Sequence, residues 1–255
     1  MMITINDPTK ANKFATLFQN LRVFTQEVFI VLEEEKLYIQ CMDTSHISML
    51  EISIDKSWFD NYMPPKSDTF GISTALLNKV FHTHKQGQSI ELHLDDEHLH
   101  IHYLNGKKKE KVFKLKLMDI DSETLGIPEQ EYNVKLNIET KAFKSIVDEL
   151  SLFSDTTTIH CTDENIGFHA QNDMCETCTN ITNEKTISYN VSDEVHTTFN
   201  LKYLQLFCQF NKVSDKIKIY MSNDLPLRFE YTLNDNSYVC FYLAPKMDDD
   251  EYDYD

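Results

Sequence analysis

Four segments of the chain carry apolar residues three and four positions apart, the spacing that places them on one face of an α-helix. The apolar positions are Phe14, Leu17, Phe18 and Leu21; Leu76, Leu77, Val80 and Phe81; Phe143, Ile146, Val147 and Leu150; and Leu204, Phe207 and Cys208. With residues 10, 74, 140 and 200 as approximate starts, the segments begin 64, 66 and 60 residues apart. The pattern therefore predicts four amphipathic helices in a fourfold repeat.

Between these segments the pattern changes to the alternation and the β-rich runs that are typical of strands. Strands are expected at residues 36–40, 89–94, 98–104, 111–117, 216–221 and 238–243. Each repeat thus combines one helix with several strands. The expected fold class is α+β, with sheets outside and the four helices packed on one face.

Residues 118–134 interrupt both periodicities and include Gly126 and Pro128, so we interpret them as a connector. It would join an N-terminal domain, residues 1–117, to a similar C-terminal domain, residues 135–247. A chain of 255 residues is long enough for two domains that each bury a core. Residues 248–255 are acidic and are expected to form a disordered tail.

The few cations are concentrated on the predicted helices. The formal net charge is −17, which by itself argues against a nucleic-acid partner. However, the windows 10–22, 74–85, 141–152 and 200–212 hold 9 bases and 2 acids, whereas the rest of the chain holds 15 bases and 39 acids. Solvated lysines off an apolar stripe are the ordinary alternative, but four helices share this bias. The predicted DNA-facing residues are Lys10, Lys13, Lys79, His82, Lys85, Lys141, Lys144, Lys202 and Lys212.

These cations are accompanied by no phosphate-binding loop and no base-reading motif, so contacts would go to the DNA backbone without sequence preference. No nucleophile with a nearby base and no paired carboxylates stand out. We therefore expect no catalytic residues, no enzymatic activity and no cofactor. No signal peptide and no apolar run long enough for a membrane span is present, so a soluble intracellular protein without a membrane partner is expected.

Two patterns raise the question of a metal site. Cys175 and Cys178 form a lone CxxC, but zinc requires two further ligands. His98, His100 and His102 alternate along one predicted strand, where same-face positions lie about 6.5 Å apart, too evenly spaced for one ion to gather all three. We interpret the histidines as an exposed strand face and predict no metal.

Residues 116–132 read KLMDIDSETLGIPEQEY, which resembles the interdomain connector loop of the proliferating cell nuclear antigen family, the eukaryotic sliding clamps. The stretches MDTSHISM at 42–49, LKYL at 201–204, DLPL at 224–227 and LAPK at 243–246 also resemble family segments, in register along the whole chain. The resemblance implies a DNA polymerase processivity factor: a ring-forming homotrimer of two-domain subunits whose helices line the inner face around duplex DNA. It would act in the nucleus, or at a cytoplasmic replication site if the protein is viral.

The resemblance also implies sites and partners. Edge strands carrying Phe113 and Leu115 would pair with neighbouring strands carrying Cys178 and Ile181 to close the trimer. A hydrophobic pocket would dock DNA polymerase and other proteins through a short peptide motif, and an ATP-driven clamp loader would place the ring on DNA. The implied pocket residues are Met42, His46, Ile47, Met49, Leu125, Ile127, Pro128, Pro226, Tyr242, Leu243, Ala244, Pro245, Lys246 and Met247.

Two positions depart from the family pattern. Asp148 stands where a basic DNA-facing residue is usual, and Asp163 stands where relatives carry a modifiable lysine. The alternatives are a subunit of a heterotrimeric checkpoint-type clamp, a monomeric viral processivity factor and a metal-dependent enzyme built on the histidine strand.

Overall fold

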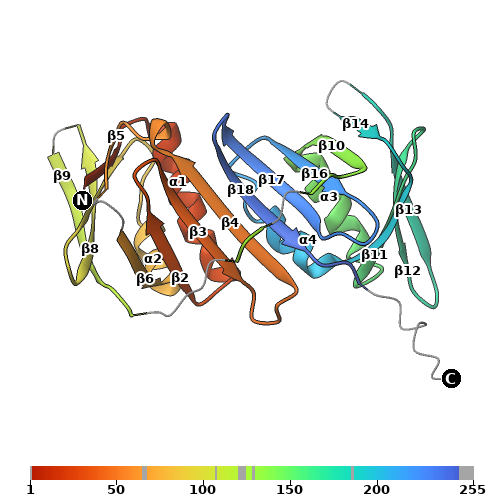
Figure 1. Ribbon diagram of the computed structural model, residues 1–255, viewed down its shortest axis with the longest axis horizontal. Coiled ribbons are helices and arrows are strands. Elements are labelled where there is room, and N and C mark those ends of the chain that lie inside the picture. The colour runs from red at the N-terminus through yellow and green to blue at the C-terminus, as the bar shows by residue number, and fades with distance from the viewer. Residues whose placement is uncertain are drawn as a thin grey trace. The chain divides into compact units, whose positions relative to one another are not determined.

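The computed structural model describes residues 2–64, 68–106, 108–119, 125–127, 130–184 and 187–246. It divides into two compact units (Figure 1). Unit 1 comprises Met1–Ile127 with Thr232–Cys240, and unit 2 comprises Pro128–Tyr231 with Phe241–Asp255. The predicted tail, residues 248–255, lies outside the described residues.

Unit 1 contains two antiparallel sheets and the helices α1 (Pro8–Asn20) and α2 (Thr74–Phe81). The first sheet has the order β5 (Asn61–Met63), β1 (Met2–Ile5), β7 (Ser89–Leu94), β8 (His98–Asn105), β9 (Lys108–Lys116). The second group pairs β6 (Asp68–Ser73), β2 (Glu27–Leu32), β3 (Lys36–Met42) and β4 (Ser48–Asp55). Short 3-10 turns occupy Leu21–Val23 and Lys56–Trp58. Helix α1 contacts β1 and β7, and α2 contacts β2 and β6.

Unit 2 repeats this construction with α3 (Thr140–Leu150) and α4 (Leu201–Cys208). One group pairs β14 (Ser188–Val191), β10 (Val134–Glu139), β16 (Lys216–Met221) and β17 (Leu227–Asn234). The other sheet has the order β13 (Glu176–Ile181), β12 (Ile166–Gln171), β11 (Thr156–Cys161), β15 (Val195–Asn200). The last strand, β18 (Ser237–Leu243), is divided between the units at Cys240.

The α-helices in the described part of the chain begin at residues 8, 74, 140 and 201, so the starts are 66, 66 and 61 residues apart. This confirms the predicted fourfold repeat. Asp7 caps α1 by accepting from the Lys10 backbone N–H at 2.8 Å, and Asn200 caps α4 in the same way. Helices α2 and α3 each start at a buried threonine instead. The Thr74 hydroxyl donates to Thr25 O at 2.6 Å, and the Thr140 hydroxyl donates to Ser214 O at 2.8 Å.

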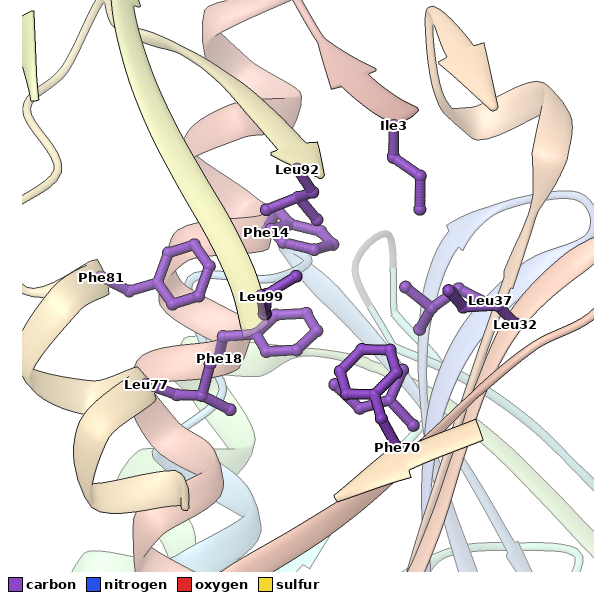
Figure 2. A pocket seen from close by; sticks show the side chains of 11 residues that line it. Ile3, Phe14, Phe18, Leu32, Leu37, Phe70, Leu77, Phe81, Leu92 and Leu99 are labelled. Carbon is purple, nitrogen blue, oxygen red and sulfur yellow. The ribbon is translucent and has the colours of Figure 1, made fainter. Parts of the chain in front are cut away.

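The core of unit 1 surrounds a small apolar cavity of about 20 Å³, room for little more than one water (Figure 2). It lies among α1, α2 and strands of both sheets, and its lining includes Phe14, Phe18, Leu77 and Leu99. One predicted core position was wrong: Leu76 is 42% exposed. The buried face of α2 is shifted and begins with the Thr74 that anchors the helix.

Candidate functional site

The predicted DNA-facing cations of unit 1 lie in or next to α1 and α2, helices that contain no Asp or Glu. Lys79, His82 and Lys85, in or just after α2, are exposed. Lys13 is half-buried on α1. Lys10 was predicted to face DNA, but its Nζ donates to Trp58 O at 2.7 Å and lies 5.5 Å from the indole centroid. Its ammonium therefore already has a hydrogen-bond acceptor and an aromatic neighbour within the chain.

In unit 2, Lys141, Lys202 and Lys212 are exposed. Lys144 forms an ion pair with Asp148 one turn along α3. Asp148, at the position where the family resemblance implies a basic residue, thereby neutralises part of the positive charge of the helix. Helix α4 contains no acid.

The loop between β3 and β4 carries the unit 1 residues assigned to the docking pocket. Asp43 is buried and organises this loop: its carboxylate accepts from the backbone N–H of Ile47 at 2.9 Å, of Ser48 at 2.7 Å and of Ser45 at 3.0 Å. His46 adopts φ 56°, and both His46 and Ile47 are exposed at the tip. Met42 and Met49 pair across the base of the loop and are half-buried.

The connector is attached to unit 1 by Gln40 on β3. The Gln40 amide donates through Nε2 to Leu125 O at 2.9 Å and accepts through Oε1 from the Leu125 backbone N–H at 2.6 Å. Leu125 is 47% exposed and Ile127 is half-buried. The structure therefore brings the described part of the connector to β3, the strand that leads into the β3–β4 loop. Burial raises the pKa of the intervening Cys41 thiol to about 12, so it stays neutral.

The unit 2 residues assigned to the pocket are placed with different exposures. Pro226, Tyr242 and Pro245 are half-buried, Ala244 and Lys246 are exposed, and Leu243 is fully buried. The Lys246 backbone N–H donates to Thr198 O at 2.8 Å, which fixes the chain after β18 beside β15. Leu243 consequently supports this segment from the core rather than facing solvent. Pro128 and Met247 lie outside the described residues.

The strands assigned to subunit contacts, β9 and β13, are edge strands of their sheets within the described chain. Strand β9 contains five lysines and one glutamate, whereas residues 173–181, which include β13, contain two acids and no base. Within the single chain Leu115 and Ile181 are buried, Phe113 packs on Tyr103 with ring centroids 5.6 Å apart, and Cys178 is exposed. The edges thus present main-chain groups and opposite charges.

The CxxC cysteines do not share a metal centre among the described residues. Cys178 Sγ lies 3.6 Å from His169 Nε2 and from Asn180 Oδ1, while Cys175 Sγ is 3.8 Å from Glu176 O. Burial raises the pKa of the Cys178 thiol, and the hydrogen bond to Asn180 only partly offsets this increase.

No helix in the described ranges is long and apolar enough to cross a membrane.

The sequence argument missed two polar side chains that shape the site, Gln40 and Asp43. Gln40 follows the inward-facing Leu37 and Ile39 in the alternation of β3, so its outward direction could be read from the pattern. Its Leu125 partner, 85 residues away, could not. Asp43 stands beside the turn-forming stretch 44–46, where Asp commonly accepts from nearby backbone N–H groups.

Comparison with known proteins gives one consistent result. Residues 9–124 match the profile of "Proliferating cell nuclear antigen, N-terminal domain", and residues 126–246 match that of the C-terminal domain. A protein of Chaetomium thermophilum named proliferating cell nuclear antigen is 33% identical over 223 residues, covering 84% of this chain and 86% of its own length. Its namesake in Caenorhabditis elegans is 30% identical over 229 residues, covering 86% and 87%.

Both halves of the repeat, the connector between them and the cation-bearing helices therefore have counterparts in one family. Its members are clamps without catalytic chemistry that serve DNA replication as processivity factors. The chain belongs to the proliferating cell nuclear antigen family, the DNA sliding clamps.

Proposed function

We propose that the protein is a homotrimeric ring that encircles duplex DNA and docks DNA polymerase and other replication and repair proteins. The observation that carries the proposal is the segregation of charge. A chain of net charge −17 has no acid on α1, α2 or α4 and exposes Lys79 on α2 and Lys202 on α4. A closed ring leaves DNA only by opening or at an end, so weak, sequence-independent phosphate contacts suffice.

The subunit contact joins β9 of one copy to β13 of the next. Each offers an unpaired edge, and edge pairing completes main-chain hydrogen bonds and removes an aggregation-prone surface. The lysines of β9 meet Glu176 of β13 and Asp173, which precedes this strand. This is a heterologous contact, which closes into a ring when the rotation per subunit fits.

Partner peptides bind where the Asp43-organised loop and the connector held by Gln40 present Ile47, Leu125 and Ile127. Exposed and half-buried aliphatic side chains on a fixed backbone suit aromatic anchors of a short peptide, and Met42 and Met49 supply adaptable walls. An ATP-driven loader opens the ring, and the protein works in the nucleus, or at a cytoplasmic replication site if it is virus-encoded.

Assembly and topology are tested together. The purified chain is expected to have a native mass near three times 29.9 kDa. After loading, it should stay on closed circular DNA and be lost when the circle is linearised. A monomer on DNA would indicate a monomeric processivity factor instead of a ring. Assembly only with other subunits would indicate a heterotrimeric clamp. Equal retention on circular and linear DNA would refute encirclement.

The DNA-facing assignment is tested by reversing charge at Lys79 and Lys202 to Glu. Loading at physiological salt should fall while the trimer and peptide docking persist. The matched control reverses Lys135 and Lys216, exposed on β10 and β16, to Glu. It changes net charge equally and should load normally, so equal defects in the two pairs would show that only net charge matters.

The docking assignment is tested by replacing Leu125 and Ile127 with Ala. Binding of a motif peptide with two aromatic anchors should weaken about tenfold or more, because anchor-contacting side chains dominate such interfaces. Trimer mass should not change. Leu152→Ala, at a position 79% exposed in unit 2, is the control and should bind like the parent. Unchanged peptide affinity in the Leu125/Ile127 variant would remove these residues from the docking site.

A further inference from the structure

One face of the β7–β8 hairpin gathers metal-ligating side chains from two strands. Glu91 and His93 are two residues apart on β7 and therefore share a face, and His102 on β8 is directly opposite Glu91. The ligand atoms of these three residues all lie within 4.8 Å of one another. The prediction of no metal considered spacing along one strand only, whereas strand pairing brings these residues together.

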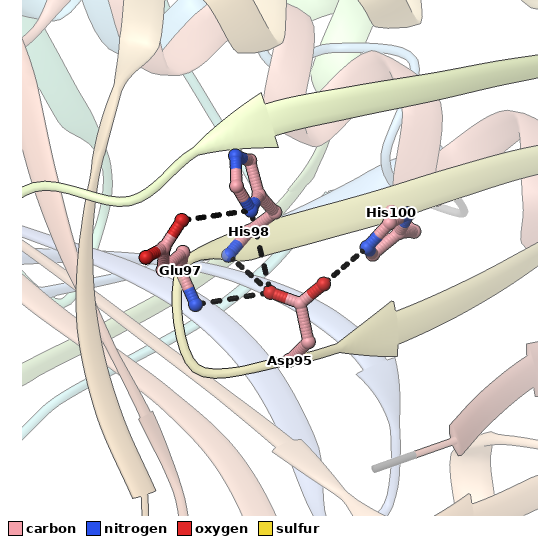
Figure 3. A network of polar contacts seen from close by, with 4 residues as sticks. All are labelled: Asp95, Glu97, His98 and His100. Carbon is pink, nitrogen blue, oxygen red and sulfur yellow. Dashed lines mark hydrogen bonds and ion pairs between the residues drawn. The ribbon is translucent and has the colours of Figure 1, made fainter.

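The other two histidines of β8 are engaged elsewhere, as Figure 3 shows. His100 Nε2 lies 2.7 Å from Asp95 Oδ2, and His98 Nδ1 lies 3.4 Å from Asp95 Oδ1. The His100 hydrogen bond is the main cause that lowers the pKa of the Asp95 carboxyl. All three histidines are half-buried rather than fully exposed. His102 is thereby left to the cluster with Glu91 and His93.

The distances in the cluster fit a compact cation. Glu91 Oε2 lies 3.5 Å from His93 Nε2 and 3.6 Å from His102 Nδ1. In tetrahedral zinc sites the metal–ligand bonds of about 2.0–2.2 Å put neighbouring donor atoms roughly 3.4 Å apart. Two edges of such a tetrahedron are therefore nearly formed. His93 Nε2 is also buried without a hydrogen-bond partner in the described part of the chain, a costly state that coordination would relieve.

A cation already approaches this position. Lys109 Nζ on β9 lies 2.9 Å from His102 Nδ1 and 3.7 Å from Glu91 Oε2. Its side chain is 49% exposed, so it can swing into solvent and be replaced. The cluster thus attracts positive charge, and the lysine competes for it.

We propose that Glu91, His93 and His102 form a site for one Zn²⁺ ion per chain. Glu91 Oε2, His93 Nε2 and His102 Nδ1 are the protein ligands, and the fourth position is open to water. Binding displaces the Lys109 ammonium from Glu91 and His102 and links β7 to β8 across the sheet.

The test titrates the full chain, after removal of metal by chelator and dialysis, with zinc in a calorimeter. The expected result is one ion per chain. His102→Ala, His93→Ala and Glu91→Gln should each weaken binding at least tenfold. His98→Ala, on the same strand and face but bound to Asp95, is the matched control and should keep the parent affinity. Lys109→Ala should bind zinc more tightly because the competing ammonium is gone.

Cobalt provides a readout of geometry, since tetrahedral Co²⁺ absorbs strongly in the visible range. The band should appear in the parent, in His98→Ala and in Lys109→Ala, and it should be lost in the three ligand variants. Circular dichroism verifies that each variant is folded, and Glu91→Gln, which is nearly isosteric, covers the case in which a histidine variant is not. Absence of stoichiometric zinc from the parent overturns the proposal. Loss of zinc in Cys178→Ser but not in Glu91→Gln assigns the ion to the CxxC segment and overturns it too.

Discussion

Tyr103 in unit 1 and Tyr231 in unit 2 occupy matching places. Tyr103 donates to Val80 O at 3.0 Å and Tyr231 to Phe207 O at 2.9 Å, each reaching the seventh residue of α2 or α4. Burial raises the pKa of both hydroxyls, which therefore remain donors. The two units thus use the same device to hold the end of a helix against a sheet.

The surroundings of these matching hydrogen bonds differ. In unit 2, Phe207 stacks on Phe241 with centroids 4.5 Å apart and also packs on Phe229 at 5.7 Å. In unit 1 the core beside α2 includes the small cavity, which is lined by aliphatic side chains together with four phenylalanines. The helix charges differ as well, because only α3 carries acids. A repeat can therefore preserve backbone geometry while its core packing and surface charge diverge.

The largest expected effect comes from the aromatic core of unit 2. Phe207→Ala removes a fully buried ring and should lower the free energy of unfolding by about 3–5 kcal/mol. Chemical denaturation monitored by circular dichroism measures this. Leu152→Ala, largely exposed, serves as the control and should be nearly neutral. A loss below about 1 kcal/mol for Phe207→Ala would contradict the tight packing of this cluster.

A smaller effect tests whether the two tyrosines are equivalent. Tyr103→Phe and Tyr231→Phe each remove one buried hydroxyl donor and leave a helix carbonyl without it, at a cost of about 1 kcal/mol. The two losses should agree closely and should add in the double variant, since the sites lie in different units. A large destabilisation in one unit and none in the other would show that the two hydrogen bonds have the same geometry but contribute differently to stability.

The smallest expected effect concerns the charge difference. Asp148→Asn frees Lys144 from its exposed ion pair. The interaction free energy of such a pair is about 1 kcal/mol or less in each subunit. DNA affinity measured over a salt series should rise and its salt dependence should steepen as Lys144 reaches phosphate. Glu149→Gln makes the same change in net charge without an ion pair to release, so it should have the weaker effect. Equal effects would mean that Lys144 does not reach DNA.

Much of the fold could be predicted because periodicity is local. The strands at 89–94 and 216–221 have the predicted bounds, and β3, β8 and β9 differ from theirs by a few residues. The four helices follow from apolar spacing. The prediction that Leu76 is buried was wrong because apolar spacing alone does not fix how a helix is rotated against the sheet. Thr74, which is buried and bonded to Thr25 O, lies on the face that turns inward.

The site was less predictable because its geometry is not local. Exposed lysines could be inferred from helical position, but the Lys10 contact with Trp58 joins residues 48 apart. The Glu91, His93 and His102 cluster likewise depends on the register of β7 with β8, which single-strand spacing does not contain. The docking residues and interface strands came from family resemblance, and their roles stay predictions for the experiments above.

The two hydrogen bonds that the Gln40 side chain forms with residue 125 involve only main-chain atoms of residue 125. They would hold any amino acid at that position equally well, apart from proline, which lacks the N–H. The side chain at residue 125 is therefore not constrained by these two hydrogen bonds. If residue 125 contacts partner peptides as proposed, substitutions there can change partner preference without breaking these two hydrogen bonds.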